Sequence, residues 1–550
     1  MFVSNIRTDF YDVIAGNRVL LLVGCDVDAI CACKILQYLF HCDNVLYTLI
    51  PVYGKTSLRE SFARHKDQAK YVILINCGST IDIVDVLEPN EEVVFFICDS
   101  HRPVNIYNIY SESQIRLLMK SSDCEGVPQY DDVFKDSDSE DEDDDDSGRP
   151  SEASVLKRRE RRLWEENRDK VMFDYNQISY FGEPSSQIMF DLAWKMSRDN
   201  NDLLWWALVG LAEQFVMNKR EQEKYILAAA SMQSHVSRHN RIENGSVNAI
   251  CNMKISFDKD LNLALYRHWT LYESMLYSKY TACKFKLWSF KGTKKMYEFL
   301  VEIGLPLSQC KQKFTAMDME CRNNVGAWME DMAEKYKLDQ IVYGSFVSQF
   351  GFKGKFCATD VVLALNALLE ATDKEKSPTD RFLDALYALS KGEVNSIKKG
   401  IELAKLRMVA IFQQVQSFIN MKHVVNAGPF LYAIVPNTTH DNKYFSHPGC
   451  LSLLAHFLLE AHVNSSRNRR AGSLPLLLFA HDEYEPDRCL VVGIPPLSEA
   501  SPKSFFGKAF EQAAEQSRIS ISQDLFCPSF TYINRNDQSK FLNALYLLLT

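Results

Sequence analysis

Apolar runs alternate with helical patterns along the first hundred residues. Four of the runs are predicted to be strands: Arg18–Val23, Val45–Val52, Tyr71–Ile75 and Val93–Cys98. They are rich in Val, Ile, Leu and Phe, which is typical of strands that helices cover on both faces. Helices are predicted between them, near Asp28–His41 and Ser57–Gln68. Connections of this length make right-handed crossovers, so the pattern predicts an α/β domain built on a parallel sheet.

Helical periodicity dominates the middle of the chain. It runs from Ser185 through Met217, and the stretch from Glu221 to about Ala371 is predicted to be almost wholly helical. The aromatic residues of that stretch are predicted to pack between helices rather than to form a stacking surface for bases. A long helix is predicted over Val394–Met421, where apolar residues recur in steps of three and four.

The carboxy-terminal part is predicted to be a smaller α/β domain. Its expected strands are Phe430–Val435, Leu476–Ala480 and Cys489–Ile494, and its expected helices are Cys450–Ala461 and Phe505–Gln516. A chain that begins and ends with α/β patterns, with helices between them, predicts two lobes that face a cleft.

The charge of the chain is concentrated in one segment. The formal net charge is −9, but Asp136–Asp146 alone holds nine acidic residues, so that 62 acids remain beside 62 bases. A near-neutral body argues against a generally basic coat for nucleic acid, although it leaves room for a local basic groove.

The segment from about Ser121 to Arg168 interrupts the α/β pattern. Its first half is acidic and poor in aliphatic residues, so it is predicted to be a disordered insertion. Ser137 and Ser139 lie among the acids and are candidate sites for an acid-directed kinase. The second half is basic and can continue as a solvated helix. Its cluster of Lys157, Arg158, Arg159, Arg161 and Arg162 is a candidate nuclear localisation signal.

The remaining composition is that of an intracellular globular protein. A length of 550 residues predicts two to four domains. No apolar run approaches the roughly 20 residues that a membrane span needs, and no secretory signal is visible. None of the fifteen cysteines forms a Cys-x-x-Cys pair, and Cys25, Cys31, Cys33 and Cys98 lie in apolar segments. We therefore expect buried reduced thiols rather than a zinc site.

Polar residues follow three of the predicted strands directly. They are Asp26-Val27-Asp28, Asn76-Cys77-Gly78 and Asp99-Ser100-His101. The carboxyl ends of parallel strands meet at one edge of a sheet, so these side chains are expected to converge. Carboxylate oxygens with a histidine suit Mg²⁺ or Mn²⁺ held for phosphoester chemistry. Taken singly, however, Asp26 fits a helix N-cap, and Asp99 and His101 could brace the turn after their strand.

These residues resemble the motifs of the DHH family of phosphoesterases, which includes RecJ-type single-strand exonucleases and a class of pyrophosphatases. Asp26 and Asp28 match the DxD motif of that family. Asn76 stands where the family has a metal-bridging aspartate, and Asp99-Ser100-His101 lacks the central histidine. Glu213 matches a later acidic position, where the family usually has an aspartate.

The asparagine decides what this resemblance implies for chemistry. A two-metal centre must offset about four positive charges, and an amide at position 76 supplies no bridging charge. We therefore expect a vestigial pocket without catalytic residues or cofactor. No metal is expected, although Asp26, Asp28 and Asp99 are the residual ligands. The alternative is an active metal-dependent DHH-type exonuclease or phosphodiesterase.

A second motif of the family is altered near the carboxyl end. DHH enzymes commonly carry a glycine-rich GGGH-type loop in a DHH-associated domain, and the matching stretch here is Ser504–Phe510. Only Gly507 remains, Lys508 stands in the place of the histidine, and two phenylalanines replace glycines. Bulky side chains would prevent the close approach of backbone to phosphate that glycines allow.

Longer strings resemble the cell division control protein 45 family of eukaryotic replication-initiation factors, which are inactive relatives of the DHH phosphoesterases. They are Leu21–Tyr38, Ile73–Gly78, Phe95–Asn105, Leu203–Gly210, Phe505–Ala514 and Ser539–Leu549. The resemblance implies a DHH-like α/β domain over 1–225, a helical connector over 226–299, a helical interaction domain over 300–393, a connecting helix over 394–425 and a DHH-associated α/β domain over 426–550.

The same resemblance implies a function that composition does not show. It implies a nuclear, non-enzymatic factor for DNA replication initiation and elongation, which acts as a scaffold subunit of the replicative helicase with the Mcm ring and the GINS tetramer. Further implied partners are replication initiation and loading factors and the DNA polymerase machinery. The resemblance implies no binding to a membrane. Contact with single-stranded DNA along the old nuclease cleft is also implied, and a protein-only adaptor remains the alternative.

Overall fold

The apolar runs of the first hundred residues form a parallel sheet. The computed structural model describes residues 1–550 except 67, 69, 135–151, 244–252, 351–353, 438–440, 467–468, 484 and 499–501. Five strands lie in the order β2-β1-β3-β4-β6, and every neighbouring pair is parallel. They are β1 (Val19–Gly24), β2 (Tyr47–Val52), β3 (Tyr71–Ile75), β4 (Val94–Cys98) and β6 (Ile115–Leu117). The predicted α/β domain is confirmed.

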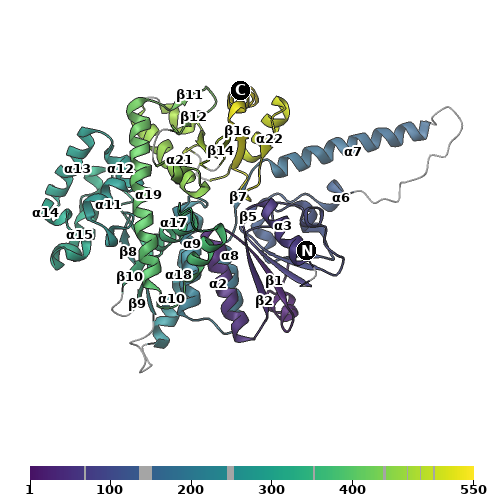
Figure 1. Ribbon diagram of the computed structural model, residues 1–550, viewed down its shortest axis with the longest axis horizontal. Helices are drawn as coiled ribbons and strands as arrows, with labels where there is room; N and C mark the ends of the chain where they lie inside the picture. The colour runs from purple at the N-terminus through teal and green to yellow at the C-terminus, as the bar shows by residue number, and fades with distance from the viewer. Residues whose placement is uncertain are drawn as a thin grey trace.

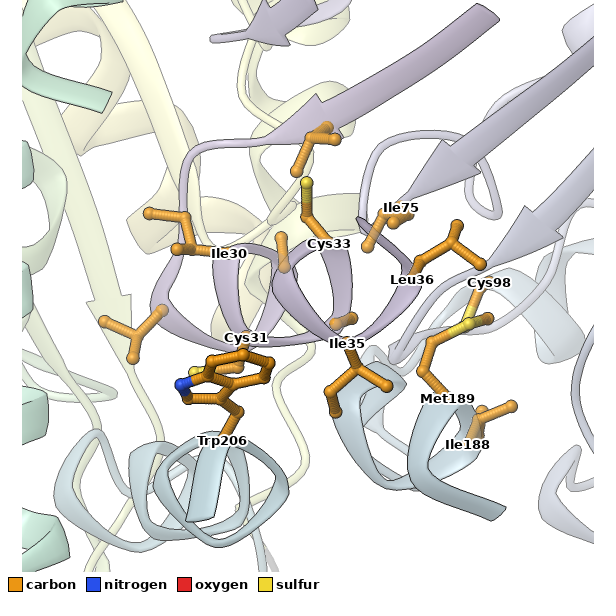
Figure 2. Packing of buried hydrophobic residues seen from close by; sticks show 14 of the residues in the cluster. Ile30, Cys31, Cys33, Ile35, Leu36, Ile75, Cys98, Ile188, Met189 and Trp206 are labelled. Atoms are coloured by element: carbon orange, nitrogen blue, oxygen red, sulfur yellow. The ribbon is translucent and has the colours of Figure 1, made fainter. Parts of the chain in front are cut away.

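Helices cover this sheet, and α2 (Val27–Cys42) is largely buried among them. α3 (Lys55–His65), α4 (Ile83–Leu87) and α5 (Ile106–Tyr110) connect the strands. α8 (Ser185–Lys195) and α9 (Asn201–Val216) pack on α2, with Cys31 beside Trp206 and Ile35 beside Met189 (Figure 2). Cys31, Cys33 and Cys98 are buried free thiols, as predicted. We call the first sheet with its helices the amino-terminal lobe.

The middle of the chain contains a sheet that the helical pattern did not predict. β8 (Met253–Leu261), β9 (Val342–Phe350) and β10 (Lys355–Cys357) form an antiparallel sheet in the order β10-β9-β8. The prediction of an almost wholly helical stretch is therefore wrong at these positions. In β8, buried Met253 and Ile255 flank exposed Lys254, which is the two-residue period of a half-buried strand.

The other elements of the middle region are helices. They are α10 (Gln222–Glu243), α11 (Leu271–Tyr277), α12 (Lys279–Phe285), α13 (Phe290–Glu302), α14 (Leu307–Cys310), α15 (Met319–Asp331), α16 (Ala333–Tyr336), α17 (Ala358–Leu369) and α18 (Pro378–Ala388). The predicted boundary after residue 299 lies inside α13. The core of α11 to α16 joins the carboxy-terminal core, whereas α17 and α18 join the core of the amino-terminal lobe. Packing therefore groups these residues differently from the predicted units.

A second, mixed sheet forms the carboxy-terminal lobe. Its strands lie in the order β11-β12-β13-β14-β16-β15, and only β12 and β13 are parallel. They are β11 (Val425–Asn426), β12 (Leu431–Ile434), β13 (Leu476–His481), β14 (Arg488–Ile494), β15 (Ile521–Ser522) and β16 (Phe530–Asn534). Helices α20 (Asn442–Phe445), α21 (Pro448–Ser465), α22 (Phe506–Ser517) and α23 (Gln538–Leu549) accompany the strands. The small α/β domain is confirmed, and α19 (Val394–Met421) passes both lobes (Figure 1).

The predicted disorder of the insertion is wrong for its first residues. A 3₁₀ turn at Ser121–Asp123 and α6 (Tyr130–Val133) are formed. Tyr130 and Phe134 pack their rings on Tyr110, with centroids 5.3 and 5.7 Å away. These aromatic contacts supply the core that the composition of the segment as a whole did not suggest.

The basic half of the insertion forms the predicted helix. α7 (Glu152–Asn176) projects away from the body of the molecule (Figure 1). Arg159, Arg161 and Arg162 are exposed on it, whereas Ser137, Ser139 and the side chains of Lys157 and Arg158 lie outside the described residues. Neither α7 nor any other helix in the described ranges is long and apolar enough to cross a bilayer.

Candidate functional site

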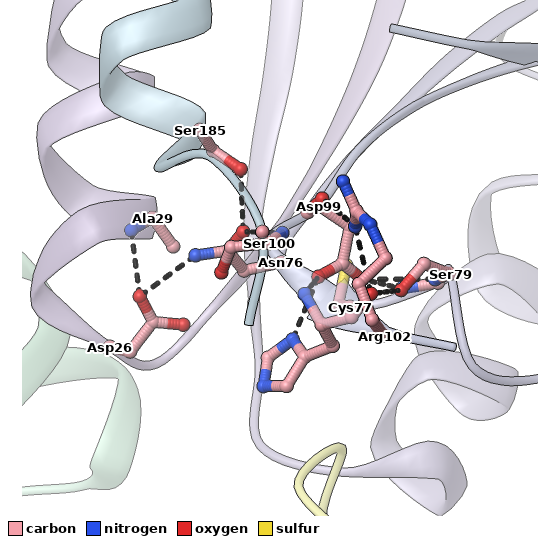
Figure 3. A network of polar contacts seen from close by, with 12 residues as sticks. Asp26, Ala29, Asn76, Cys77, Ser79, Asp99, Ser100, Arg102 and Ser185 are labelled. Carbon is pink, nitrogen blue, oxygen red and sulfur yellow. Dashed lines mark hydrogen bonds and ion pairs between the residues drawn. The ribbon is translucent and has the colours of Figure 1, made fainter. Parts of the chain in front are cut away.

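The polar residues that follow the strands of the first sheet lie together at its carboxyl edge (Figure 3). We call Asp26, Asp28, Asn76, Asp99, His101 and Glu213 the strand-end pocket. Asp26 ends the turn after β1 and is the N-cap of α2, where its carboxylate accepts the backbone N–H of Ala29 at 2.8 Å. The capping role that the sequence left open for Asp26 is present. It uses one of the oxygens that a metal would need.

Asn76 is a hydrogen-bond donor at the centre of the pocket. Its Nδ2 lies 3.0 Å from Asp26 Oδ1 and 3.0 Å from Asp28 Oδ2. Its Oδ1 accepts the backbone N–H of Ser100 at 3.1 Å. A backbone N–H can only donate, so this contact fixes which end of the amide faces the two carboxylates. The backbone of Asn76 is left-handed, with φ +50°, which asparagine tolerates better than most residues.

Asp28 is 2% exposed, and its carboxylate is saturated by donors from the chain. Besides Asn76, it accepts the backbone N–H groups of Ser185 and Ser186 at 2.8 and 3.0 Å, and the Ser186 hydroxyl at 2.5 Å. The two serines begin α8, so Asp28 satisfies the free N–H groups of that helix. Burial, then the charge of Asp26, raises the pKa of Asp28. Asp28 therefore anchors α8 rather than facing open space.

Asp99 is equally enclosed, at 1% exposure. One oxygen accepts the backbone N–H groups of Gly78 and Ser79 at 3.0 and 2.9 Å, and the other contacts His101 Nδ1 at 2.7 Å. Burial alone would raise the pKa of Asp99, but the charge and hydrogen bonds of His101 hold it well below its usual range. Arg102 Nη1 donates to the carbonyls of Asp99 and His101 at 2.8 and 2.9 Å. Asp99 and His101 thus brace the turn after β4.

Glu213 reaches the pocket from α9 and bridges two groups. Its Oε2 accepts the backbone N–H of Asp28 at 3.1 Å, and its Oε1 accepts the ammonium of Lys219 at 2.8 Å. Sequence reasoning missed Lys219, as it missed Ser185 and Ser186. Lys219 follows Asn218, whose φ of +52° turns the chain back at the end of α9. An asparagine directly after an apolar helix was the available signal for that reversal.

The donor set does not fit the two metal ions that the resemblance to DHH enzymes implies. An N–H donor stands where a bridging carboxylate is required, and it points at two of the remaining carboxylates. In Asp28 and in Asp99, both carboxylate oxygens accept hydrogen bonds from other groups of the chain. Across the described ranges, no group of three or more His, Cys, Asp or Glu residues is arranged to hold a metal ion.

A cavity of about 480 Å³ separates the two lobes, so the predicted cleft is present. Asp26, Asn76, His101, Glu213 and Lys219 line it from the amino-terminal lobe. The carboxy-terminal lobe contributes Arg488, Ser504, Asp524 and Tyr532 among others. Asp28 and Asp99 lie behind the wall. Only part of the strand-end pocket is therefore open to a molecule in the cavity.

Three polar bridges join the parts of the chain around this cavity. Ser179 and Ser504 exchange backbone hydrogen bonds at 2.7 and 2.8 Å. Asp524 accepts the N–H and the hydroxyl of Thr56 at the start of α3, each at 2.8 Å. Glu370 pairs with Arg407 and accepts the first N–H groups of α21, Gly449 at 2.6 Å among them. The bridges fix the lobes relative to one another.

The Ser504–Phe510 segment forms the start of α22 and is packed with aromatic rings. Phe506 is fully buried and stacks with Phe505 at 4.5 Å between ring centroids. Its ring lies so close to Gly493 that a Cβ there would be 2.2 Å from Phe506 Cγ. Lys508 pairs with Glu511 at 2.8 Å. A segment with two bulky rings cannot bring its backbone as close to a phosphate as a glycine loop does.

Comparisons with known proteins point to one group of relatives. A family model described as CDC45 matches residues 19–152 and 119–548. The cell division control protein 45 homolog of Homo sapiens is 45% identical over 567 aligned residues, which cover 100% of both chains. The homolog of Schizosaccharomyces pombe is 27% identical, over 97% of this chain and 96% of its own.

A solved structure shares the fold. The crystal structure of CDC45 from Entamoeba histolytica covers 100% of both chains with a TM-score of 0.72 and 21% sequence identity. The two-lobed arrangement of this chain is therefore that of a known structure.

Proposed function

The chain belongs to the CDC45 family, and from that premise we propose that it is a non-enzymatic scaffold subunit of the replicative helicase. Its relatives are cell division control proteins 45, so its role lies in DNA replication. The proposed partners are the Mcm ring and the GINS tetramer, together with replication initiation and loading factors and the DNA polymerase machinery, and the proposed location is the nucleus.

The single observation that supports a non-enzymatic role is the orientation of Asn76. Its amide donates to Asp26 and Asp28, each at 3.0 Å, and so ties together the carboxylates that a hydrolase would present to metal ions. Activation of water by two ions requires free carboxylate oxygens between them. In this chain those oxygens stabilise the fold instead.

A scaffold also needs surfaces, and the helices of the middle region offer one. Phe290 and Val301 of α13 are 87% and 63% exposed, and their spacing of eleven residues places them on one helix face. Met319, at the start of α15, is 69% exposed. Large apolar side chains that face solvent on the helices of this region suit a protein partner. We assign the contact with the Mcm ring or GINS to this face.

The proposal includes a contact with single-stranded DNA at the cleft. Arg488 lies over the ring of Tyr532, 3.8 Å from its centroid, and both line the cavity. A guanidinium beside an aromatic ring can hold a phosphate and stack on a base. Affinity for an oligonucleotide should fall with salt, and Arg488→Glu should weaken it at low salt. If the chain has no affinity for the oligonucleotide at low salt, the alternative of an adaptor that binds only proteins is favoured.

The assembly is tested with purified components. The full chain, the Mcm ring and GINS are mixed and run on size exclusion, and we expect a single complex. The double variant Phe290→Asp with Val301→Asp should weaken it about tenfold or more, because charges would enter an apolar interface. The matched control is Leu227→Asp, on α10, whose side chain is 72% exposed. Separate elution of the wild-type chain would contradict the proposed function.

A further inference from the structure

One lysine lies among the acidic residues of the strand-end pocket. The Nζ of Lys219 is 2.8 Å from Glu213 Oε1, and the two side chains are 19% and 3% exposed. The ammonium also lies 5.1 Å from the ring centroid of Phe181, which belongs to the short strand β7 (Tyr180–Phe181). This lysine is held in place by an ion pair and an aromatic ring, unlike a surface lysine that is free to rotate.

The backbone around Lys219 is shaped to bring it there. α9 ends at Val216, and the left-handed Asn218 reverses the chain. The backbone N–H of Lys219 then donates to the carbonyl of Gln214 at 2.9 Å, which closes the end of the helix. The side chain therefore points back at Glu213, in the preceding turn.

Charge explains why a cation is needed at this point. Asp26, Asp28 and Glu213 bring three carboxylates into one pocket, two of them almost fully buried. Buried carboxylates must be neutralised or paired with a cation. Asp99 has His101 as its partner. Of the other cations that line the cavity, Arg381 donates to the carbonyl of Ala371 at 2.7 Å, and Arg488 lies over Tyr532.

We propose that the Lys219 ammonium is the resident cation of the strand-end pocket, in the place of a divalent ion, and that Lys219 and Asn76 together keep such an ion out. The inference rests on the non-enzymatic part of the proposed function and is independent of its partners. It assigns a latent site for a hard divalent cation such as Mn²⁺ to Asp26 and Glu213, which line the cavity, with an aspartate at position 76 as the missing ligand.

The two residues exclude the ion in different ways, so both must change to open the site. Asn76→Asp alone adds a fourth carboxylate but leaves the ammonium in place. Lys219→Ala alone removes the cation but leaves an N–H donor that faces Asp26 and Asp28. The double variant, Asn76→Asp with Lys219→Ala, frees one oxygen of Asp26 from the amide and one oxygen of Glu213 from the ammonium. It leaves an uncompensated negative charge that a divalent ion can satisfy.

The test is a titration of the full chain with Mn²⁺, read by the loss of the electron paramagnetic resonance signal of the free ion. We expect the double variant to bind Mn²⁺ at least about tenfold more tightly than the wild type, a difference of about 1.4 kcal/mol. Mg²⁺ should compete. Lys224→Ala is the matched control, because Lys224 is 48% exposed and pairs with Glu221 at 3.4 Å outside the pocket. This control should bind no more Mn²⁺ than the wild type.

A folded double variant that binds Mn²⁺ no better than the wild type would overturn the inference, as would a wild-type chain that binds it equally well. If this double variant is unstable, thermal unfolding of a second double variant, Asn76→Asp with Lys219→Met, with and without millimolar Mn²⁺ makes the same comparison. Mn²⁺ should then raise the unfolding temperature of this variant more than that of the wild type, and an equal response would contradict the inference. Failure to assemble with the Mcm ring and GINS would contradict the proposed function alone.

Discussion

The strand-end pocket and the Ser504–Phe510 segment, whose Ser504 lines the same cavity, differ from the DHH pattern in opposite ways. In the pocket the acidic residues are present, but donors of the chain occupy their oxygens, Asn76 and Lys219 among them. In the segment Gly507 alone remains of the glycines, and the rings of Phe505 and Phe506 stack on each other at the start of α22. Carboxylates at strand ends therefore do not by themselves indicate a metal site, since the groups that face them decide their role.

If the pocket carboxylates hold the fold, removal of the most saturated one should have the largest effect. Asp28→Ala leaves the N–H groups of Ser185 and Ser186 and the amide of Asn76 without their acceptor. We expect a loss of about 4 kcal/mol in unfolding free energy. Urea unfolding followed by circular dichroism measures it. A loss below about 1 kcal/mol would show that the carboxylate is not a structural anchor.

The segment should depend on apolar packing instead of hydrogen bonds. Phe506→Ala removes a fully buried ring and should cost about 3 kcal/mol. Phe505→Ala, at the half-buried neighbour, is the matched control and should cost clearly less. Equal losses for the two variants in the same unfolding experiment would contradict the packing role of Phe506.

The contribution of Asp99 to stability should depend on pH, which distinguishes the pocket from the apolar segment. Its pKa is lowered in the folded protein from an ordinary value of 3.8. Below that value the unfolded state binds more protons than the folded state, so the stability from Asp99 is complete at neutral pH and is lost as the pH falls through the acid range. Asp99→Asn should cost about 2 kcal/mol at neutral pH. It should also flatten the acid limb of a plot of stability against pH, and an unchanged limb would contradict the account.

The smallest expected loss of stability comes from a substitution that tests how closely α9 approaches the strand-end pocket. At Gly210 a Cβ would lie 2.0 Å from Ser186 Oγ and 2.7 Å from Asp28 Oδ1. Gly210→Ala should therefore cost about 1 to 2 kcal/mol by overpacking. Gly326→Ala, in α15, is the control because a Cβ there meets nothing within 4 Å. It should be neutral or stabilising by up to about 1 kcal/mol. A neutral Gly210→Ala would show that the pocket can relax.

Much of this fold could be predicted because its core follows simple periods. The long helix over Val394–Met421 and the strand Tyr71–Ile75 were predicted with the bounds that the structure shows. The sheet of β8 and β9 was missed because its strands pair across about eighty residues of intervening chain, and such pairing leaves only a short alternation in the sequence. A local sequence pattern does not reveal which distant segments pack together.

The sequence predicted which residues lie in the strand-end pocket, but it did not predict the hydrogen bonds between them. The strand ends brought Asp26, Asn76 and Asp99 together because parallel strands share an edge. The direction of the Asn76 amide depends on the backbone N–H of Ser100, and no spacing in the sequence reveals that contact. The position of the Lys219 side chain depends on the reversal of the chain direction after α9. Such contacts are tertiary, and they decide whether a carboxylate is a ligand or an anchor.

The most direct measurement is an assay of the wild-type chain with millimolar Mn²⁺ and a labelled single-stranded oligonucleotide, run beside the variant Asp26→Ala. Inorganic pyrophosphate serves as a second substrate. The account predicts no product above the level of the variant, because the carboxylates of the strand-end pocket are committed to hydrogen bonds within the chain. Release of nucleotides or phosphate by the wild type that Asp26→Ala abolishes would contradict it.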